Sequence, residues 1–336
     1  MSPPVDRDVV VVGGGPAGCS AAIFAAREGL DVAVFDRGRS SLARCAHLEN
    51  YLGFPAGVDV ETFADLAHAH AERAGCSVVA DLVESVDRLD PEAGEPDGVP
   101  AGFRVTPQAG DPVTARRVVA ATRYGGGYLR GLDNDEAMFE THEYDGERRE
   151  HFDRGYADRD GTTPVEGLYV ASPSDADRQV VTASGRGARV GKRVVADARI
   201  DDGWWPAAAE GVDWLRREAE MDDERADRDR RAERFDERHA DGPVDPDSER
   251  FARVREAAID ASLSSYVDAD EAESRAATGR RALAAHLDPT AVVDAHGAEA
   301  LLDAIDDGAI ASYAADGGSA DAEEPADAGT AAGGTR

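Results

Sequence analysis

Apolar residues recur with two different periods along the first part of the chain. Val9–Val12 is a run of four β-branched residues, which predicts a buried strand, and a second short apolar run ends at Asp36. The alanine-rich run between them is typical of a helix. Strand, helix and strand in this order predict a complete βαβ unit over residues 9–36.

The same two patterns predict the remaining elements of an α/β fold. β-rich segments occur at residues 76–80, 82–88, 117–122 and 167–171, and residues 102–106 with 113–115 predict a small hairpin. Helical spacing predicts one helix over residues 59–74 and another from about residue 177 to 199, whose small residues allow close packing. Residues 133–160 are charged with few apolar positions, so we expect a loop with short helical pieces there.

The pattern changes after residue 200. Residues 222–239 are almost entirely charged, with Phe235 as their lone large apolar residue, which predicts a solvated helix or linker with no face to bury. An apolar stripe from Phe251 to Tyr266 predicts a helix, Asp268 can cap another that reaches about Leu287, and a short helix is expected near residues 298–305. We expect a domain over residues 1–200, an acidic helical extension over 201–315 and a disordered tail over 316–336.

A glycine cluster between the first strand and the first helix carries the clearest chemistry. Gly13 allows a tight turn, Gly15 lets the backbone approach a pyrophosphate, and Gly18 lets the helix pack closely on the strands. Phosphates would lie over the helix N-terminus, where unpaired N–H groups favour anions. Asp36 is placed to accept hydrogen bonds from both ribose hydroxyls, which disfavours a 2′-phosphate. The motif predicts nucleotide binding; the alternative is a glycine turn that binds nothing.

The charge balance excludes some classes of partner. The chain has 37 basic and 68 acidic side chains, a net charge of −31, and Lys192 is its only lysine. Such a surface argues against nonspecific binding to nucleic acids or anionic membranes. Because the acidic excess is spread over every segment, we favour adaptation to molar salt, a halophilic composition, over an acidic surface made for one basic partner.

Cysteine and histidine positions give weaker signals. Cys19, Cys45 and Cys76 form no C-x-x-C pair, and no apolar run is long enough to cross a bilayer, so we expect a cytoplasmic protein. His68 and His70 lie two positions apart on the predicted helix, hence on different faces, which argues against a shared metal site. We interpret both as solvated or core histidines and predict no metal.

Four segments together resemble a known family. They read VVVVGGGPAGCSAAIFAAREG, HLENYLGFPAGVDVETFADLAHAHAERAG, RVVAAT, and GLYVA with the downstream RQVVTASGRGA. In content and order they are similar to the FAD domain of the low-molecular-weight thioredoxin reductases, over residues 5 to about 200. The resemblance implies an α/β fold: a Rossmann-like FAD-binding domain with a parallel sheet in three layers of the ββα/βαβ type, here followed by a C-terminal α-helical extension.

The resemblance also implies which residues contact FAD. Asp36 would hold the adenosine ribose, Val83 would meet the adenine through its backbone, and Asn50 would lie near the isoalloxazine ring. The helix that starts at residues 178–180 would point its N–H groups at the flavin pyrimidine and stabilise the reduced anion. The full expected set is Gly13, Gly15, Pro16, Ala17, Gly18, Asp36, Arg37, Asn50, Val83, Thr122, Arg178, Gln179 and Val180.

Departures from the family are equally informative. The family carries an NADPH-binding domain and a redox C-x-x-C between the third and fourth segments, where this chain has only about forty residues, 123–164, many of them charged. The family's A-T-G turn reads Ala121-Thr122-Arg123, and its Gly-Asp pair reads Ser172-Pro173, so a contact to the phosphoribityl part is lost unless Asp175 replaces it.

Two functions remain open from the sequence. The first is an FAD-dependent oxidoreductase, not a conventional thioredoxin reductase, that exchanges electrons with a redox partner protein or a small-molecule donor. Cys45, two residues before His47, is its only candidate redox-active thiol, against the alternative of an idle cysteine. The second is a non-catalytic FAD- or nucleotide-binding sensor or assembly protein. A homodimer is compatible with either.

Overall fold

The computed structural model describes residues 5–38, 40–89, 102–123, 125–144, 147–174, 178–211, 216–218 and 226–315. The chain divides into two compact units, Met1–Leu283 and Ala284–Arg336. The predictions for Asp175 and for the tail at 316–336 lie outside the described residues.

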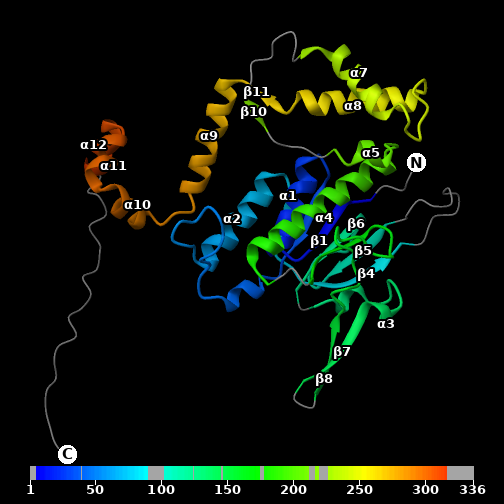
Figure 1. Ribbon diagram of the computed structural model, residues 1–336. Helices are drawn as coiled ribbons and strands as arrows, with labels where there is room; N and C mark the ends of the chain where they lie inside the picture. Colours follow the sequence, from blue (N-terminus) through cyan, green and yellow to red (C-terminus); the bar gives the residue numbers. More distant parts are fainter. Residues whose placement is uncertain are drawn as a thin grey trace, which may run out of the picture. The chain divides into compact units, whose positions relative to one another are not determined.

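The first unit is built on a seven-stranded sheet (Figure 1). Three parallel strands, β1 (Arg7–Val12), β2 (Val32–Phe35) and β3 (Ser77–Val79), form one side in the order β3-β2-β1. The predicted βαβ unit is confirmed, with α1 (Pro16–Arg27) as its helix. Continuous apolar sequence makes these strands, because a parallel sheet buries both of its faces.

One long strand joins the parallel and antiparallel parts of the sheet. β6 (Val113–Ala121) pairs in parallel with β1 and β9 (Leu168–Ser172), while its first residues pair antiparallel with β5 (Phe103–Pro107). β5 in turn pairs antiparallel with β4 (Val83–Arg88). The segments predicted as a hairpin arm at 113–115 and a separate strand at 117–122 are therefore one strand.

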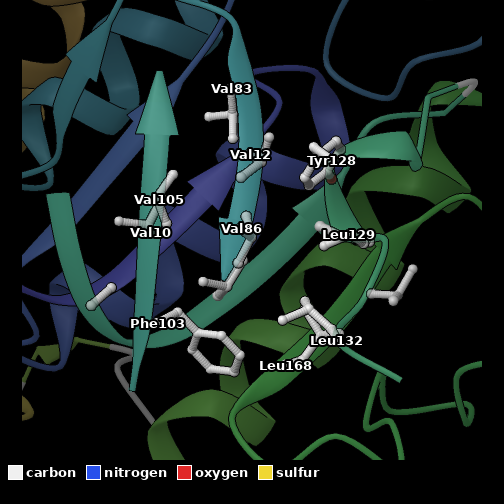
Figure 2. Close-up of a cluster of buried hydrophobic side chains, with 14 of the residues drawn as sticks. Val10, Val12, Val83, Val86, Phe103, Val105, Tyr128, Leu129, Leu132 and Leu168 are labelled. Carbon is white, nitrogen blue, oxygen red and sulfur yellow. The ribbon is translucent and has the colours of Figure 1, made fainter. Parts of the chain in front are cut away.

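Helices cover one face of the sheet and an apolar layer covers the other. Helices α1, α2 (Val60–Arg73) and α4 (Val180–Asp201) supply the first layer, where Val9 and Val11 of β1 point. Val10 and Val12 point to the opposite face, which Figure 2 shows with side chains from β4, β5 and the turn η2 (Gly127–Leu129). Because successive side chains of a strand point to opposite faces, the four valines contribute to the hydrophobic cores on both sides of the sheet. A Rossmann-like three-layer α/β domain results.

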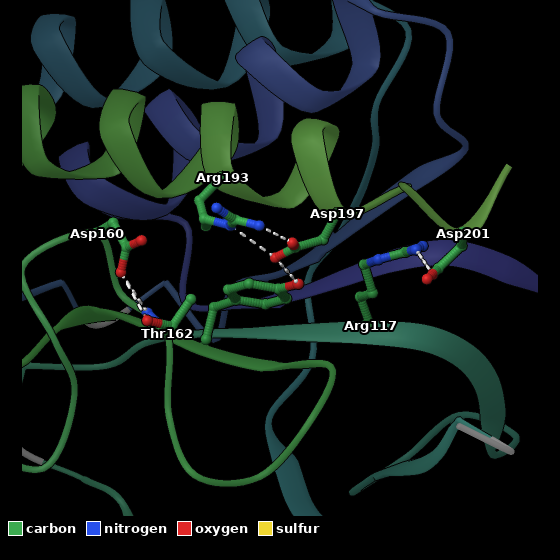
Figure 3. Close-up of polar contacts among 7 residues, drawn as sticks. Arg117, Asp160, Thr162, Arg193, Asp197 and Asp201 are labelled. Carbon is green, nitrogen blue, oxygen red and sulfur yellow. Dashed lines mark hydrogen bonds and ion pairs between the residues drawn. The ribbon is translucent and has the colours of Figure 1, made fainter. Parts of the chain in front are cut away.

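The C-terminal half of α4 is fixed to the sheet by polar contacts. Tyr169 of β9 donates its hydroxyl to Asp197 Oδ2 at 2.7 Å, and Arg193 also binds Asp197. Arg117 of β6 pairs with Asp201 at the end of the same helix (Figure 3). All these groups have partners within the protein, so this network is structural.

The charged stretch after β6 forms a hairpin, which corrects the predicted loop. A short helix, α3 (Asp135–Met138), leads into the antiparallel pair β7 (Phe139–Tyr144) and β8 (Glu147–Phe152). The prediction was wrong because most residues of the two strands are charged, so no alternation of apolar and polar positions marks them in the sequence. The apolar anchors lie at the base of the hairpin. Phe139 and Phe152 pack there at 5.6 Å between ring centroids.

After α4 the first unit continues with helices and short strands, and a small aromatic cluster packs among some of them. These elements are α5 (Pro206–Ala209), β10 (Arg217–Glu218), α7 (Arg228–His239), α8 (Glu249–Leu263), β11 (Tyr266–Val267) and α9 (Ala269–Ala284). Trp205 stacks on Phe251 and donates its indole N–H to His239 Nδ1 at 3.2 Å. Phe235 also packs on this cluster. The prediction that residues 222–239 have no face to bury is therefore wrong: one aromatic and one histidine suffice to dock α7.

The second unit is described up to residue 315. It contains α10 (Pro289–His296), α11 (Ala298–Ala304) and α12 (Asp307–Ala315), of which only α11 was predicted. Asp288 caps α10 by accepting the Ala291 N–H. No residue in these three helices is buried.

Candidate functional site

A cavity of about 840 Å³ opens where the carboxyl ends of β1 and β2 meet the N-termini of α1 and α4. In open α/β sheets this edge is the usual place for a ligand. Its lining includes every residue predicted to bind the cofactor except Gly18: Gly13, Gly15, Pro16, Ala17, Asp36, Arg37, Asn50, Val83, Thr122, Arg178, Gln179 and Val180. Residues from six separate parts of the chain thus meet at one surface.

The glycine loop is tight where the sequence predicts close packing and open where it predicts a ligand. A Cβ atom on Gly18 would lie 1.8 Å from the Gly13 carbonyl oxygen, so Gly18 sits beneath the loop and holds α1 against it. Gly13 has φ +112°, and a Cβ there would meet the Ala121 oxygen at 2.6 Å. At Gly15 the nearest atom to such a Cβ is Ser40 Oγ, at 3.6 Å. The backbone at Gly15 is therefore open to the cavity.

Two helix N-termini border the cavity without a side-chain cap. The first turn of α1 begins at Gly15 and that of α4 at Gln179, and in neither does the N-cap side chain accept a backbone N–H. By contrast, Asp59 caps α2 by accepting the Thr62 N–H. The N–H groups in the first turn of a helix and the helix dipole favour negative charge. The donors at α1 fit a diphosphate, and those at α4 fit an anionic ring system such as reduced flavin.

Asp36 follows β2 and turns its carboxylate toward the loop. Its side chain is 11% exposed; Oδ1 accepts the Gly38 N–H at 3.1 Å and Oδ2 lies 3.1 Å from His68 Nε2. The hydrogen bond from His68, more than any other cause, lowers the pKa of the Asp36 carboxyl below its usual value. The carboxylate is therefore ionised and fixed in orientation at the cavity wall.

His68 is the main residue that the sequence reasoning misplaced. Its side chain is partly exposed but is held by polar contacts rather than by an apolar core: besides Asp36, Nε2 lies 3.0 Å from the Gly14 carbonyl oxygen. The carboxylate of Asp36 raises the pKa of His68 to about 10. No local pattern joins positions 36 and 68, because the contact depends on how α2 lies across the end of β2. Among the described residues no cluster of histidine, cysteine and carboxylate side chains suits a metal ion.

Cys45 lies at the cavity and is exposed. It follows the turn η1 (Ser41–Arg44), and its backbone N–H donates to the Leu42 carbonyl at 2.7 Å. His47 also lines the cavity, with Nε2 3.3 Å from the Ala56 carbonyl. The thiol is thus placed at the ligand surface, whereas Cys19 and Cys76 are buried.

Asn50 and Gln179 connect two segments that are distant in sequence. The Asn50 side-chain amide donates to Gln179 Oε1 at 2.7 Å, which ties the loop before α2 to the start of α4. Tyr51, Phe54 and Phe63 pack edge to face beside them. This aromatic group holds the loop against α2, so that Asn50 stays at the cavity.

The opposite wall comes from the end of β6 and the turn after it. Thr122 Oγ1 lies 3.1 Å from the hydroxyl of Tyr128, a buried cavity residue that the sequence did not single out. Burial raises the pKa of the Tyr128 phenol, which therefore stays neutral. Val83 at the start of β4 and Ser172 at the end of β9 complete the lining.

Comparison with known proteins gives a partial match at the level of sequence. Residues 7–122 match the family described as pyridine nucleotide-disulphide oxidoreductase. This segment runs from β1 to the end of β6 and carries the glycine loop, Asp36, Asn50 and Val83.

Curated relatives are similar over part of their length. The chain is 32% identical over 136 residues to the thioredoxin reductase of Streptomyces coelicolor, covering 39% of this chain and 38% of that protein. Against the thioredoxin reductase of Streptomyces clavuligerus it is 37% identical over 84 residues, 24% of this chain and 26% of the relative. The chain thus spans well under half the length of these relatives.

Solved structures are similar at low sequence identity. A thioredoxin reductase from Gloeobacter violaceus is 17% identical, with TM-score 0.43, over 60% of this chain and 97% of that one. An atypical thioredoxin reductase from Desulfovibrio vulgaris Hildenborough is 19% identical, with TM-score 0.44, over 59% of this chain and 100% of that one. TM-scores below 0.5 do not by themselves establish a common fold. Among the described residues of this chain, no helix is long and apolar enough to cross a membrane.

Proposed function

We propose that this chain is an FAD-dependent oxidoreductase, similar to the thioredoxin reductases, that exchanges electrons with an external donor or acceptor. The match of residues 7–122 to the pyridine nucleotide-disulphide oxidoreductase family and the partial identity to thioredoxin reductases support it. The observation that carries this proposal is the single cavity that joins the glycine loop, Asp36, Asn50 and the start of α4. An extended dinucleotide needs such a continuous site, with anion-binding groups at two places along it.

In this proposal, different residues bind different parts of the cofactor. The N–H groups at the start of α1 bind the diphosphate, and Asp36 accepts hydrogen bonds from the ribose. Bound FAD supplies the capacity to accept and pass on electrons. The N–H groups at the start of α4 stabilise negative charge on the ring, while Asn50 positions that helix end through Gln179.

An external donor or acceptor follows from the segment between β6 and β9. Its described part holds α3 and the β7–β8 hairpin, and the chain's sequence contains no second G-x-G-x-x-G and no C-x-x-C. The partner is therefore a redox protein or a small-molecule donor that reaches the open cavity. A homodimer remains compatible with this assignment.

A non-catalytic role is the second candidate, because one cavity wall differs from the family pattern. Ser172, followed by Pro173, lies at the end of β9 where the resemblance expects a Gly-Asp pair. Serine and proline offer no carboxylate to the phosphoribityl part of FAD. A sensor or assembly protein would bind the cofactor without turning it over.

The absorbance spectrum of the purified protein tests the proposal. Flavin bands, bleached by dithionite and restored by air, support an oxidoreductase. A colourless protein that takes up no added FAD would contradict the proposed oxidoreductase function. A colourless protein that binds ADP would favour the second candidate. Bleaching by NADPH alone would contradict the need for an external reductase.

Cys45 is tested by its replacement with serine. If the thiol lies against the flavin ring, Cys45→Ser shifts the flavin absorbance bands and changes the rate of reoxidation. Cys76→Ser is the matched control, since Cys76 is buried away from the cavity. Identical spectra for the wild type and Cys45→Ser would show that Cys45 is idle.

A further inference from the structure

His68 contacts two parts of the nucleotide-binding surface at once. Its Nε2 lies 3.1 Å from Asp36 Oδ2 and 3.0 Å from the Gly14 carbonyl oxygen. A single N–H directed between two acceptors joins the carboxylate after β2 to the loop after β1. A Cβ on Gly14 would lie 2.6 Å from Asp36 Cβ, so these two segments already touch. The imidazole comes from α2, none of whose residues lines the cavity, so His68 acts on the cavity wall through its contacts to Asp36 and Gly14.

Few charged groups share this corner. Arg37, next to Asp36, is the other cation that lowers the pKa of the carboxyl, through a weaker effect than that of His68. Cys19 of α1 lies against His68 and donates its thiol to the Gly14 oxygen at 3.1 Å. The His68 imidazolium and the Asp36 carboxylate therefore balance each other, with Arg37 at the rim and the Cys19 thiol behind.

We propose that His68 is a positioning residue for the adenosine ribose: it holds Asp36 and the glycine loop in one arrangement that accepts a nucleotide with free ribose hydroxyls. This inference rests on the proposed nucleotide site and explains how that site would select a nucleotide without a 2′-phosphate. With Oδ1 on the Gly38 N–H and Oδ2 on His68, the plane of the carboxylate is set. Its remaining lone pairs serve the ribose.

The same arrangement disfavours a 2′-phosphate. An ionised carboxylate repels a phosphate at that position, and like charges in contact cost several kcal/mol at interfaces. His68 contributes by keeping Asp36 ionised to low pH. Without His68, Asp36 is a largely buried carboxyl, and its burial favours the protonated form. A protonated carboxyl accepts the ribose hydroxyls less well and repels phosphate less.

The experiment compares three variants of the full chain by titration calorimetry: His68→Ala, His68→Gln, and His70→Gln as a control. His70 lies on the same helix, and its pKa is lowered by burial and by the charge of Arg27 rather than raised by Asp36. The probes are FAD, ADP and adenosine 2′,5′-bisphosphate, each measured near neutral pH and at about pH 4.5, close to the ordinary pKa of a carboxyl. Circular dichroism checks that each variant is folded.

We expect His68→Ala to weaken FAD and ADP binding roughly tenfold near neutral pH, the effect of one lost charge-assisted hydrogen bond. The loss grows at acid pH, where the wild type stays nearly constant. In the same variant, the ratio of the affinities for ADP and for adenosine 2′,5′-bisphosphate decreases as well. His68→Gln keeps a donor and recovers much of the affinity but not the resistance to acid, and His70→Gln behaves as the wild type.

Failure of this inference is distinguishable from failure of the proposed function. If the wild type binds neither FAD nor ADP, the nucleotide site itself is wrong. If the wild type binds both, and folded His68→Ala shows the same affinities, pH profile and preference, His68 does not position Asp36. A uniform loss in His68→Ala with an unchanged pH profile and preference would also overturn the proposal, since it would indicate only general destabilisation.

Discussion

At the residue scale, the parts of the site that the sequence predicts are those that lie close together in the chain. Gly13, Gly15 and Asp36 belong to one βαβ unit, whose geometry fixes their separation, so their position at the cavity could be expected. His68 could not be placed in this way. Its partners are Asp36 and Gly14, and the contact exists only once α2 packs beside the strands.

The ion pair of His68 and Asp36 should make the free energy of unfolding depend on pH. Because the folded pKa of His68, about 10, exceeds its ordinary value of 6.5, its contribution is fully present below about pH 6.5 and is lost as the pH rises toward 10. The contribution of Asp36 is lost only as the pH falls through its lowered pKa. The difference in unfolding free energy between wild type and His68→Gln should therefore shrink from about pH 6 to pH 10. Urea denaturation at both values measures it, and a constant difference would contradict it.

At the element scale, the helices of the α/β domain were predictable from spacing, whereas the hairpin was not. Asp59 and the apolar stripe mark α2, and Asp268 accepts the Glu271 N–H as expected at the start of α9. The hairpin strands have charged residues on both faces, so no alternation of apolar and polar positions marks them. The helices of the second unit bury no residue. Because a buried face is what requires apolar residues at helical spacing, these helices show no such stripe in the sequence.

The packing of α4 on α1 depends on Gly187, whereas Gly185 of the same helix takes no part in it. A Cβ on Gly187 would lie 2.1 Å from the Ala17 oxygen, whereas nothing lies within 4 Å of one on Gly185. Gly187→Ala should lower the unfolding free energy by about 1–3 kcal/mol through overpacking. In contrast, Gly185→Ala should raise it by up to about 1 kcal/mol, because alanine is the better helix former. Chemical denaturation of both variants tests this; equal effects would mean that α4 does not approach α1 so closely.

At the scale of the whole molecule, net charge is the dominant property. A charge of −31 produces self-repulsion that is screened over about 10 Å at 0.1 M salt and about 3 Å at 1 M. We therefore expect the melting temperature to rise steeply with KCl, and much less with sucrose, which is excluded from the surface but screens nothing. Differential scanning fluorimetry in both series measures the contrast. Equal rises would show that the acidic surface does not limit stability.

The pairing of β6 with β9 also bears on how such a chain can change over evolution. Ala121 and Ser172 are register partners, so the two ends of the intervening connection are anchored by strands that are already neighbours. The sheet registers do not depend on what the connection contains, and each doubling of a flexible loop costs only about 0.6 kcal/mol of closure entropy. Beyond the turn that carries Tyr128, this point of the fold can thus gain or lose sequence, by recombination or by design, while the two strands stay neighbours.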